Sequence, residues 1–512
     1  MQRRSFLAAL GAAPFGLTLR DVMAMPPNAA AEPDAWATGF AAARARQPWL
    51  AGYQGASADL PPSTLAVEGA FPPALHGAFY RNGPARHEIG GVRYHHLFEG
   101  DGMIQRYDIR AAGVTHRGVF VRTDKFEADS AAGHPQRATF GTANPDMEPV
   151  AAPDAINVAN TSLVMQGNEM LALWEGGSAT RVDPDTLRTL GIKTWRADYA
   201  GMPFSAHPKV EPDGTLWNFG VSSAAGLLTV YCVGADGALK RVQSVPVPDV
   251  AMVHDFAVTE RHLVFLLPPF VFDKERAQSG VSFLDAHVWR PELGMRALVL
   301  DKNDAERMRW FQLPAGFVFH LGNAWSSPDG QEIHLDTVRS DDATIVTTTL
   351  RELMRGQTRP TPGAHLTQLR LNLRTGRAEQ VATEHVAEFP KIDTRRTTLR
   401  HRALFCVAHT RPAGDPHLLP GFDTLMRFDT ESGKTAQYRF AQRVLVEEHV
   451  FVPASATARE GEGWLVGTVF DVDAGCTKLT AFDARDVAAG PVATAKLSGA
   501  APLGLHGLFR PA

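Results

Sequence analysis

The stretch Leu369–Gly376, with the sequence LRLNLRTG, places leucine at every second position and then turns at Arg-Thr-Gly. A period of two is the spacing of a β-strand that buries one face. The same order of strand, aspartate and glycine-containing turn recurs at Leu425–Gly433 (LMRFDTESG), and similar runs end in turns at Val182–Asp185 (VDPD) and Gly234–Gly237 (GADG). Sheets joined in this way close into barrels, sandwiches or propellers. We therefore expect an all-β protein.

Sustained helical periodicity is scarce outside this strand-and-turn pattern. We expect one helix over residues 34–46 and a short one over residues 304–308. No linker divides the chain, so the sequence predicts an N-terminal helical or extended segment at 32–59 and one β domain at 60–512. Repeats of fixed period are not visible, and periodicity alone therefore does not count the sheets.

The composition is that of an ordinary globular protein, with 512 residues, 44% of them hydrophobic, and a formal net charge of −4. A nucleic-acid-binding protein would carry a basic surface, so we expect no nucleic-acid partner. The three cysteines, Cys232, Cys406 and Cys476, are too far apart for a metal knuckle and too few for a disulfide framework. We expect them to be small buried hydrophobic residues.

Residues 1–31 have the pattern of an export signal. Paired arginines in Arg3–Leu7 (RRSFL) precede an apolar run, Leu7–Leu19, that is too short to span a bilayer and ends at Arg20. The arginine pair followed by Phe-Leu is typical of the twin-arginine pathway. We therefore expect export by the twin-arginine machinery and a periplasmic location.

Four of the nineteen histidines stand in apolar or tight-turn sequence: His207, His254, His320 and His506. Burying an imidazole costs free energy unless both ring nitrogens are paired, and a metal ion plus one acceptor pairs both. The gaps between them are 47, 66 and 186 positions, which excludes a pair carried on one helix. Ligands projected by separate strands toward a common axis fit these gaps.

Several further motifs accompany the four histidine segments. They are Phe79–Pro84 (FYRNGP), His96–Met103 (HLFEGDGM), Phe120–Thr123 (FVRT), Glu388–Asp393 (EFPKID) and Gly463-Trp464. In this order, from about residue 60 onward, the chain resembles the carotenoid cleavage oxygenases, the family of retinal-pigment-epithelium-type dioxygenases. The resemblance implies a seven-bladed β-propeller with iron(II) on its axis and a cap of loops and short helices over the iron site. It also implies oxidative cleavage of a conjugated C=C bond by O₂.

The resemblance assigns His207, His254, His320 and His506 as ligands of one Fe(2+) ion. It also implies that Glu175, Glu388 and Glu448 hold the ligating imidazoles. Glu448 lies in a run where His449 stands in place of the family's proline, and Glu447 is a competing candidate. Four neutral imidazoles leave an iron(II) site at +2, so three carboxylates that accept the outer N–H bonds would orient the rings and offset that charge.

Four protein ligands leave up to two octahedral positions open, for O₂ and for substrate. Some relatives carry a threonine near an open position, and Thr161 is the matching residue. The substrate would be an apolar conjugated molecule, and we favour an apocarotenoid. The alternative is a lignin-derived hydroxystilbene, for which related enzymes hold the phenolate with a tyrosine and a lysine. Tyr94 and Lys125 are the candidates for that pair.

Two further alternatives concern the surface and the class of protein. The apolar stretch Pro268–Phe272 (PPFVF) could form a channel mouth or a peripheral membrane contact, or it could be a buried connection between blades. A periplasmic propeller that binds a partner without catalysis is the alternative from another class. A zinc hydrolase is disfavoured, because four histidines without a carboxylate or thiolate ligand are an unusual zinc set.

Overall fold

The computed structural model describes residues 33–144, 146–358 and 363–512. Within it, Pro33–Ala512 form one compact unit. The predicted export signal at residues 1–31 lies outside the described residues, so export and periplasmic location stay predictions. None of the helices in the described part combines the length and apolar composition that crossing a bilayer requires.

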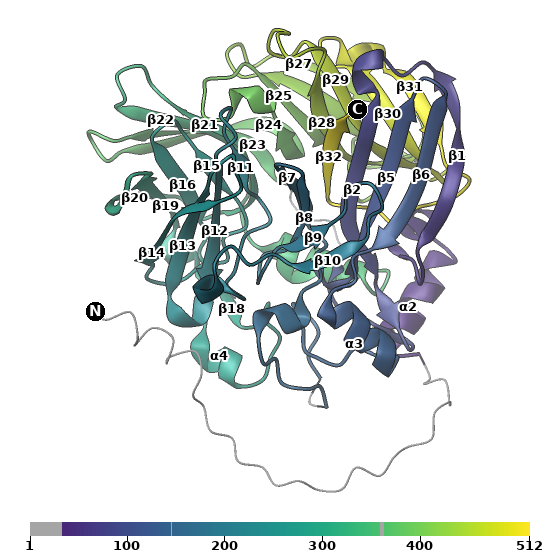
Figure 1. Ribbon diagram of the computed structural model, residues 1–512, viewed down its shortest axis with the longest axis horizontal. Helices are drawn as coiled ribbons and strands as arrows, with labels where there is room; N and C mark the ends of the chain where they lie inside the picture. Colours follow the sequence, from purple (N-terminus) through teal and green to yellow (C-terminus); the bar gives the residue numbers. More distant parts are fainter. Residues whose placement is uncertain (1–32, 145, 359–362) are drawn as a thin grey trace, which may run out of the picture. The chain divides into compact units, whose positions relative to one another are not determined.

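The described residues form a propeller of seven antiparallel blades (Figure 1). Three four-stranded sheets are single blades, and the seven-stranded and nine-stranded sheets each combine two. Blade 1 contains β32 (His506–Pro511), β2 (Gly77–Arg86), β5 (Asp101–Arg110) and β6 (Gly113–Phe120). Blade 2 contains β7 (Ser162–Gln166), β8 (Glu169–Leu173), β9 (Thr180–Val182) and β10 (Thr189–Ile192). Blade 3 contains β11 (Lys209–Val210), β12 (Leu216–Ser222), β13 (Leu227–Val233) and β14 (Leu239–Pro246).

The remaining blades follow in chain order. Blade 4 contains β15 (Phe256–Val258), β16 (His262–Leu267), β19 (Met295–Asp301) and β20 (Asp304–Leu313). Blade 5 contains β21 (Phe317–Ser326), β22 (Glu332–Ser340), β23 (His365–Asn372) and the first part of β24 (Ala378–Lys391). Blade 6 contains the rest of β24, β25 (Ala403–Ala408), β26 (Thr424–Asp429) and β27 (Thr435–Arg439). Blade 7 contains β28 (Val444–Pro453), β29 (Gly463–Asp471), β30 (Cys476–Asp483) and β31 (Pro491–Lys496).

Segments far apart in the sequence close the ring of blades. Strand β32 pairs with β2, so that His506 lies opposite Asn82. Strand β1 (Leu60–Gly69) joins blades 1 and 7, because its first part pairs with β6 and its last part with β31. Because β1 pairs with both of them, the outer strands β6 and β31 do not form free edges that could pair with another chain.

The predicted strand-and-turn unit is confirmed at Leu369–Gly376. Leu369 and Leu371 are buried on β23 while Arg370 between them is exposed. The side chain of Asn372 accepts hydrogen bonds from the backbone N–H groups of residues 374 and 375, and Gly376 takes a left-handed φ of 74°. Glycine occupies that conformation without a steric penalty, which explains its place in the turn.

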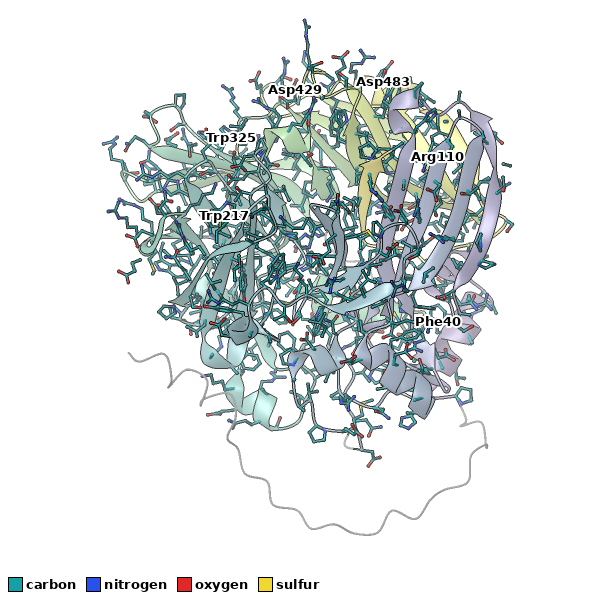
Figure 2. All side chains as sticks on the ribbon, viewed as in Figure 1. Phe40, Arg110, Trp217, Trp325, Asp429 and Asp483 are labelled. Carbon is teal, nitrogen blue, oxygen red and sulfur yellow. The ribbon has the colours of Figure 1, made fainter. Side chains whose placement is uncertain are left out.

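At other strand ends, aspartate side chains accept hydrogen bonds from the turn backbone as Asn372 does. Asp429 accepts from the backbone N–H groups of residues 431 and 432 after β26, and Asp183 from those of 185 and 186 after β9. Asp483 is the last residue of β30 and accepts from the backbone N–H of residue 485. Asp429 and Asp483 lie at the same end of the blades (Figure 2). The recurring aspartate is therefore a turn-forming residue rather than a catalytic one.

Helices are few and short: α2 (Ala35–Arg44), α3 (Asp124–Ala132), α4 (Lys274–Gln278) and α5 (Leu350–Leu353). Helix α2 confirms the helix expected at residues 34–46, and Asp34 caps its N-terminus through the backbone N–H of Ala37. Helices α2, α3 and α4 lie on the same side of the blades (Figure 1). This side therefore carries a cover of short helices and loops.

The helix expected at residues 304–308 is wrong, because these residues begin strand β20. Ala-Glu-Arg-Met favours a helix locally, but so short a run cannot hold one by propensity alone. Pairing with β19 along residues 304–313 and burial of Ala305 and Phe311 decide the outcome.

The apolar stretch Pro268–Phe272 is a buried connection. Its first four residues are buried, and β17 (Phe270–Phe272) pairs with β18 (His287–Trp289). It connects β16 and β19, two strands of blade 4, rather than two blades. Phe272 at its end is half-buried and lies 6.2 Å from the exposed Phe283, and a channel mouth here stays a prediction. The three cysteines are free, two of them buried and Cys232 half-buried. Peripheral membrane contact stays a prediction.

Candidate metal centre

The structure brings together the four predicted histidines, His207, His254, His320 and His506. Their ligand nitrogens all lie within 4.8 Å of one another. Each of these residues is at most 8% exposed. His207 and His254 lie two positions before the first strands of blades 3 and 4, His320 lies in the first strand of blade 5, and His506 begins β32. Separate strands therefore project the four imidazoles to one point.

Three of the imidazoles are held from outside by the predicted glutamates. Glu448 on β28 lies 2.7 Å from Nδ1 of His506, and Glu388 on β24 lies 2.5 Å from Nδ1 of His320. Glu175, which follows β8, contacts Nδ1 of His254. With Nδ1 occupied, Nε2 of each ring faces the centre of the group. This is the arrangement in which a carboxylate fixes the tautomer and orientation of a metal-binding histidine.

The Nε2 atoms of the histidine rings lie close enough together to bind one cation between them. Nε2 of His207 and Nε2 of His254 are 2.9 Å apart, and Nε2 of His320 is buried without a hydrogen-bond partner within the described part of the chain. A buried ring nitrogen without a partner costs free energy, which a shared cation would offset. The four histidines thus form a group that can hold a metal ion.

Burial keeps three of these imidazoles, those of His207, His254 and His506, neutral, with their lone pairs free for a metal. It lowers the pKa of His207 and His254 well below the ordinary value, and that of His506 to about 4. Metal binding requires the deprotonated ring, so the environment favours the ligand form at neutral pH. Four imidazole nitrogens are a donor set that suits divalent iron, copper, nickel or zinc.

Glu448, and not its neighbour Glu447, is the carboxylate that meets His506. Although burial opposes ionisation, the Lys391 ammonium 2.7 Å away and His506 hold the pKa of Glu448 well below its usual range. Glu447 instead accepts from the backbone N–H of Gly504, and burial raises its pKa. His449, which stands in the proline position, turns away to Thr480.

The candidate pair Tyr94 and Lys125 is in contact, at 2.6 Å between the hydroxyl and the ammonium. Both side chains are buried, and Lys125 also meets Asp101 at 3.0 Å and Asp129 at 2.9 Å. Tyr94 donates to Asp129. The hydroxyl of Thr161 donates to the neighbouring side chain of Asn160 rather than toward the histidines. Tyr94, Lys125 and Thr161 therefore each have a hydrogen-bond or ion-pair partner within the protein.

A series of phenylalanine rings leads away from the histidines. Phe319 lies 5.2 Å from His254, Phe98 lies 5.9 Å from Phe319, and Phe140 lies 5.9 Å from Phe98. Phe283 follows, 5.9 Å from Phe140 and 42% exposed. The sequence alone does not single out these four phenylalanines, because they come from four separate segments that meet only in the folded chain.

Sequence reasoning also missed three charged residues beside the site: Lys209, Asp255 and Lys391. Lys209 pairs with Asp255 at 2.7 Å, and Lys391 pairs with Glu448 at the same distance. Their positions in the sequence could have indicated them, because each lies within three positions of a predicted site residue.

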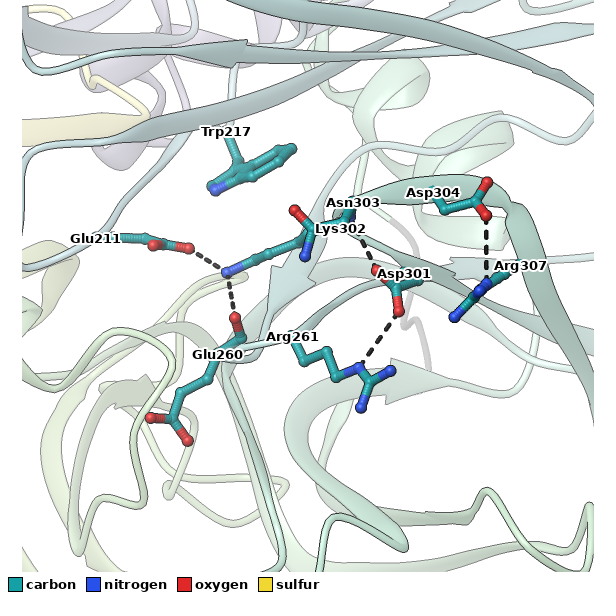
Figure 3. A pocket seen from close by; sticks show the side chains of 9 residues that line it. All are labelled: Glu211, Trp217, Glu260, Arg261, Asp301, Lys302, Asn303, Asp304 and Arg307. Atoms are coloured by element: carbon teal, nitrogen blue, oxygen red, sulfur yellow. Dashed lines mark hydrogen bonds and ion pairs between the residues drawn. The ribbon is translucent and has the colours of Figure 1, made fainter.

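A separate surface pocket of about 450 Å³ lies between blades 3 and 4 (Figure 3). Charged side chains and Trp217 line it, and the buried ammonium of Lys302 pairs there with Glu211. None of the four histidines belongs to this pocket, so it is not the metal centre.

Fold and site together define a class: a β-propeller whose axis carries four imidazoles backed by three carboxylates. The sequence assigns the family, because residues 55–511 match the retinal pigment epithelial membrane protein family. The chain belongs to this family, that of the carotenoid cleavage oxygenases, and is an oxidoreductase. It is 30% identical to the apocarotenoid-15,15'-oxygenase of Synechocystis sp., over 90% of this chain and 96% of that protein.

Two solved structures are similar over most of their length. Cobalt-substituted Synechocystis apocarotenoid oxygenase matches with a TM-score of 0.81 and 26% identity, over 91% of this chain and 99% of that one. The lignostilbene dioxygenase of Pseudomonas brassicacearum matches with a TM-score of 0.80 and 27% identity, over the same shares of the two chains. The predicted propeller fold and family are thus confirmed, and a non-catalytic binding protein is not what the comparisons indicate.

Proposed function

We propose that this protein is an iron(II) dioxygenase that cleaves a conjugated C=C bond of an apocarotenoid with O₂. The observation that carries the proposal is the group of four buried imidazoles with ligand nitrogens within 4.8 Å of one another. Three of them are backed by glutamates, as in other histidine-held metal sites. The similarity to the apocarotenoid-15,15'-oxygenase of Synechocystis sp. supports this substrate class.

The chemistry needs a metal, and His207, His254, His320 and His506 would hold it. Iron(II), when bound, supplies the one-electron chemistry that lets O₂ react with a closed-shell double bond. In the overall reaction one C=C bond breaks and two C=O bonds form, so both oxygen atoms are consumed. The protein needs no nucleophile. Its glutamates keep the imidazoles oriented, and the burial of the histidines excludes water from the reacting centre.

The phenylalanine series supports an apolar substrate. Phe319, Phe98 and Phe140 offer only ring faces and edges next to the histidines. A polyene gains free energy by leaving water for such surroundings, at roughly 25 cal/mol per Å² of apolar surface buried. A polar substrate would lose its hydration here without finding hydrogen-bond partners.

A hydroxystilbene is the second candidate substrate. The contact between Tyr94 and Lys125, and the similarity to a lignostilbene dioxygenase, favour it. Against it stands the environment of Lys125, whose ammonium already meets two carboxylates. A phenolate would have to displace Asp101 or Asp129 from that ammonium. We therefore place the apocarotenoid first.

A product assay tests the proposal. The purified protein is loaded with iron(II) without oxygen, then given O₂ and, in turn, β-carotene, an apocarotenal, a hydroxystilbene and isoeugenol. We expect stoichiometric iron and carbonyl fragments of the apocarotenal by mass spectrometry, with both oxygen atoms derived from ¹⁸O₂. A protein that takes up no stoichiometric iron, and consumes no oxygen with any of these substrates, would contradict the proposal.

We also propose that the protein is exported to the periplasm by the twin-arginine machinery. Arg3 and Arg4 support this, because the pathway recognises the arginine pair. Replacing both with lysine should leave the protein in the cytoplasm of a bacterium that otherwise exports it. Fractionation followed by immunoblotting measures this, and unchanged export of the double variant would contradict the proposal.

A further inference from the structure

The carboxylate of Asp255 joins the three segments that carry His207, His254 and His320. One oxygen lies 2.7 Å from the ammonium of Lys209, and the other accepts from the backbone N–H of Leu321 at 2.8 Å. Lys209 is two residues after His207, Asp255 directly follows His254, and Leu321 directly follows His320. One buried side chain therefore ties blades 3, 4 and 5 together beside their histidines.

His207 depends most on this connection. It has no carboxylate partner among the residues that the structure describes, unlike the other three histidines. Its ring is therefore placed by its backbone, which Ser205 holds on one side by accepting from the His207 N–H. On the other side, the backbone leads through Pro208 to Lys209 and so to Asp255.

Burying the ion pair between Asp255 and Lys209 costs free energy, which argues for a role beyond general stability. Asp255 is 3% exposed, and Lys209 is largely buried too. Removing two charges from water is expensive, and such a pair is often no more stabilising than apolar residues of the same volume. What it does supply is a fixed geometry, because the carboxylate accepts from an ammonium and from two backbone N–H groups, those of Phe256 and Leu321.

We propose that Asp255 and Lys209 are positioning residues of the metal centre, which fix His207 relative to His254 and His320. This inference rests on the proposed metal-binding function. The pair touches no metal ligand side chain in the contacts described; it acts through the backbone of the three ligand-bearing segments. Breaking it should loosen the four-imidazole arrangement while the blades stay folded.

A second buried pair provides a matched control. Lys302 pairs with Glu211, and also donates to the backbone carbonyl of Glu260 at 3.2 Å (Figure 3). This pair likewise joins blade 3 to blade 4, but it lies in the surface pocket away from the histidines. Its loss should therefore lower stability without disturbing the metal centre.

Binding of Co²⁺ to the metal-free protein tests the inference, with affinity from competition against a chelator and geometry from the cobalt absorption spectrum. We expect Asp255→Asn and Lys209→Met to weaken Co²⁺ binding roughly 10–100-fold, the usual effect of a group that orients a ligand, and to alter the spectrum. Lys209→Arg keeps the cation and should restore both. Lys302→Met should lower the melting temperature and leave affinity and spectrum unchanged.

The outcomes separate this inference from the proposed function. A wild-type protein that fails to bind one Co²⁺, or a His254→Ala variant that binds it as well, would refute the metal centre itself. If the wild type binds Co²⁺ but both Asp255→Asn and Lys209→Met bind it equally tightly with the same spectrum, the positioning role is refuted. Equal weakening by Lys302→Met would also refute it, because the effect would then reflect stability alone.

Discussion

The three glutamates that meet the histidines differ in how firmly they are held. Glu448 is fully buried and accepts from His506 and from the backbone N–H of Gly507, with Lys391 at 2.7 Å. The side chain of Glu175, in contrast, is 31% exposed. A carboxylate with several fixed partners orients an imidazole more strictly than one that water can reach. The centre is thus rigid at His506 and more adaptable at His254.

This difference predicts unequal effects of removing the charge. Glu448→Gln should weaken metal binding roughly 10–100-fold, because the amide leaves Lys391 without its counter-ion and its NH2 group must face the N–H of either His506 or Gly507. Glu175→Gln should have a smaller effect, since solvent can replace the lost interaction. Metal retained after dialysis against a chelator measures both. Equal losses in the two variants would contradict the ranking.

Removing a ligand tests the centre directly. His254→Ala or His506→Ala should abolish stoichiometric iron binding, because three imidazoles cannot complete the arrangement. The β structure should persist, since core clusters between the blades are built from other residues. Metal analysis and circular dichroism on the same sample give both readouts. Retained iron and activity in either variant would contradict the ligand assignment.

The sequence predicted the four histidines and the three glutamates of the centre, because each stands in a short motif. It could not choose between Glu447 and Glu448, since both carboxylates are buried and adjacent in one strand. It placed Asp255 next to His254, but it could not show what the Asp255 carboxylate binds. Its role depends on Leu321, which lies 66 positions away, and only the folded chain brings the two together.

Irregular strands carry the site residues at the scale of secondary structure. The pairing register shifts near His320 in β21, between Glu388 and Lys391 in β24, and around Glu448 in β28. A bulge re-aims a side chain and is common beside active sites. In β24 the shift includes Phe389, whose φ of 53° lies in the left-handed region. The alternation of residues predicted regular strands, so these shifts did not follow from the sequence.

The bulge in β24 places the ring of Phe389 against two ligands. It lies 5.1 Å from His320 and 5.4 Å from His506. Phe389→Ala should speed metal loss to a chelator several-fold, because water then reaches both imidazoles. As a control, Phe451→Ala removes a core ring that stacks on Phe405, and should cost about 3–5 kcal/mol of stability without faster metal loss. Equal metal loss in both variants would contradict the shielding role.

At the scale of the whole molecule, every blade contributes one residue to the centre. In blade order these residues are His506, Glu175, His207, His254, His320, Glu388 and Glu448. Alternation of leucines and aspartate-capped turns predicted the all-β class, and family resemblance supplied the number of blades. No local pattern counts blades, because each differs in loop length and sequence.

The molecule also buries many histidines outside the centre, and this predicts sensitivity to acid. Burial lowers the pKa of His87, His96 and His449 to about 3, and that of His116 and His287 to about 4. Between pH 6.5 and these values the unfolded chain binds protons that the folded protein does not. Stability should therefore fall as the pH falls through this window, by up to about 1.4 kcal/mol per pH unit for each histidine.

Denaturant unfolding of the metal-free protein at pH 7.5, 6 and 5 measures this effect without metal release. His116→Gln provides a control, since it should remove up to one proton from the pH dependence. A stability that stays constant from pH 7.5 to pH 5 would contradict the prediction.

The pairing of β2 with β32 has a consequence for how the chain folds. Arg81 donates to the backbone of Leu505, 424 residues away, within the sheet that this pairing completes. Contacts between such distant segments form slowly, because the long intervening loop must first be ordered. During synthesis β2 therefore waits with one unpaired edge until nearly all other blades have been made. The same late step delivers His506, so a chain caught before closure is both prone to aggregation and unable to hold its metal.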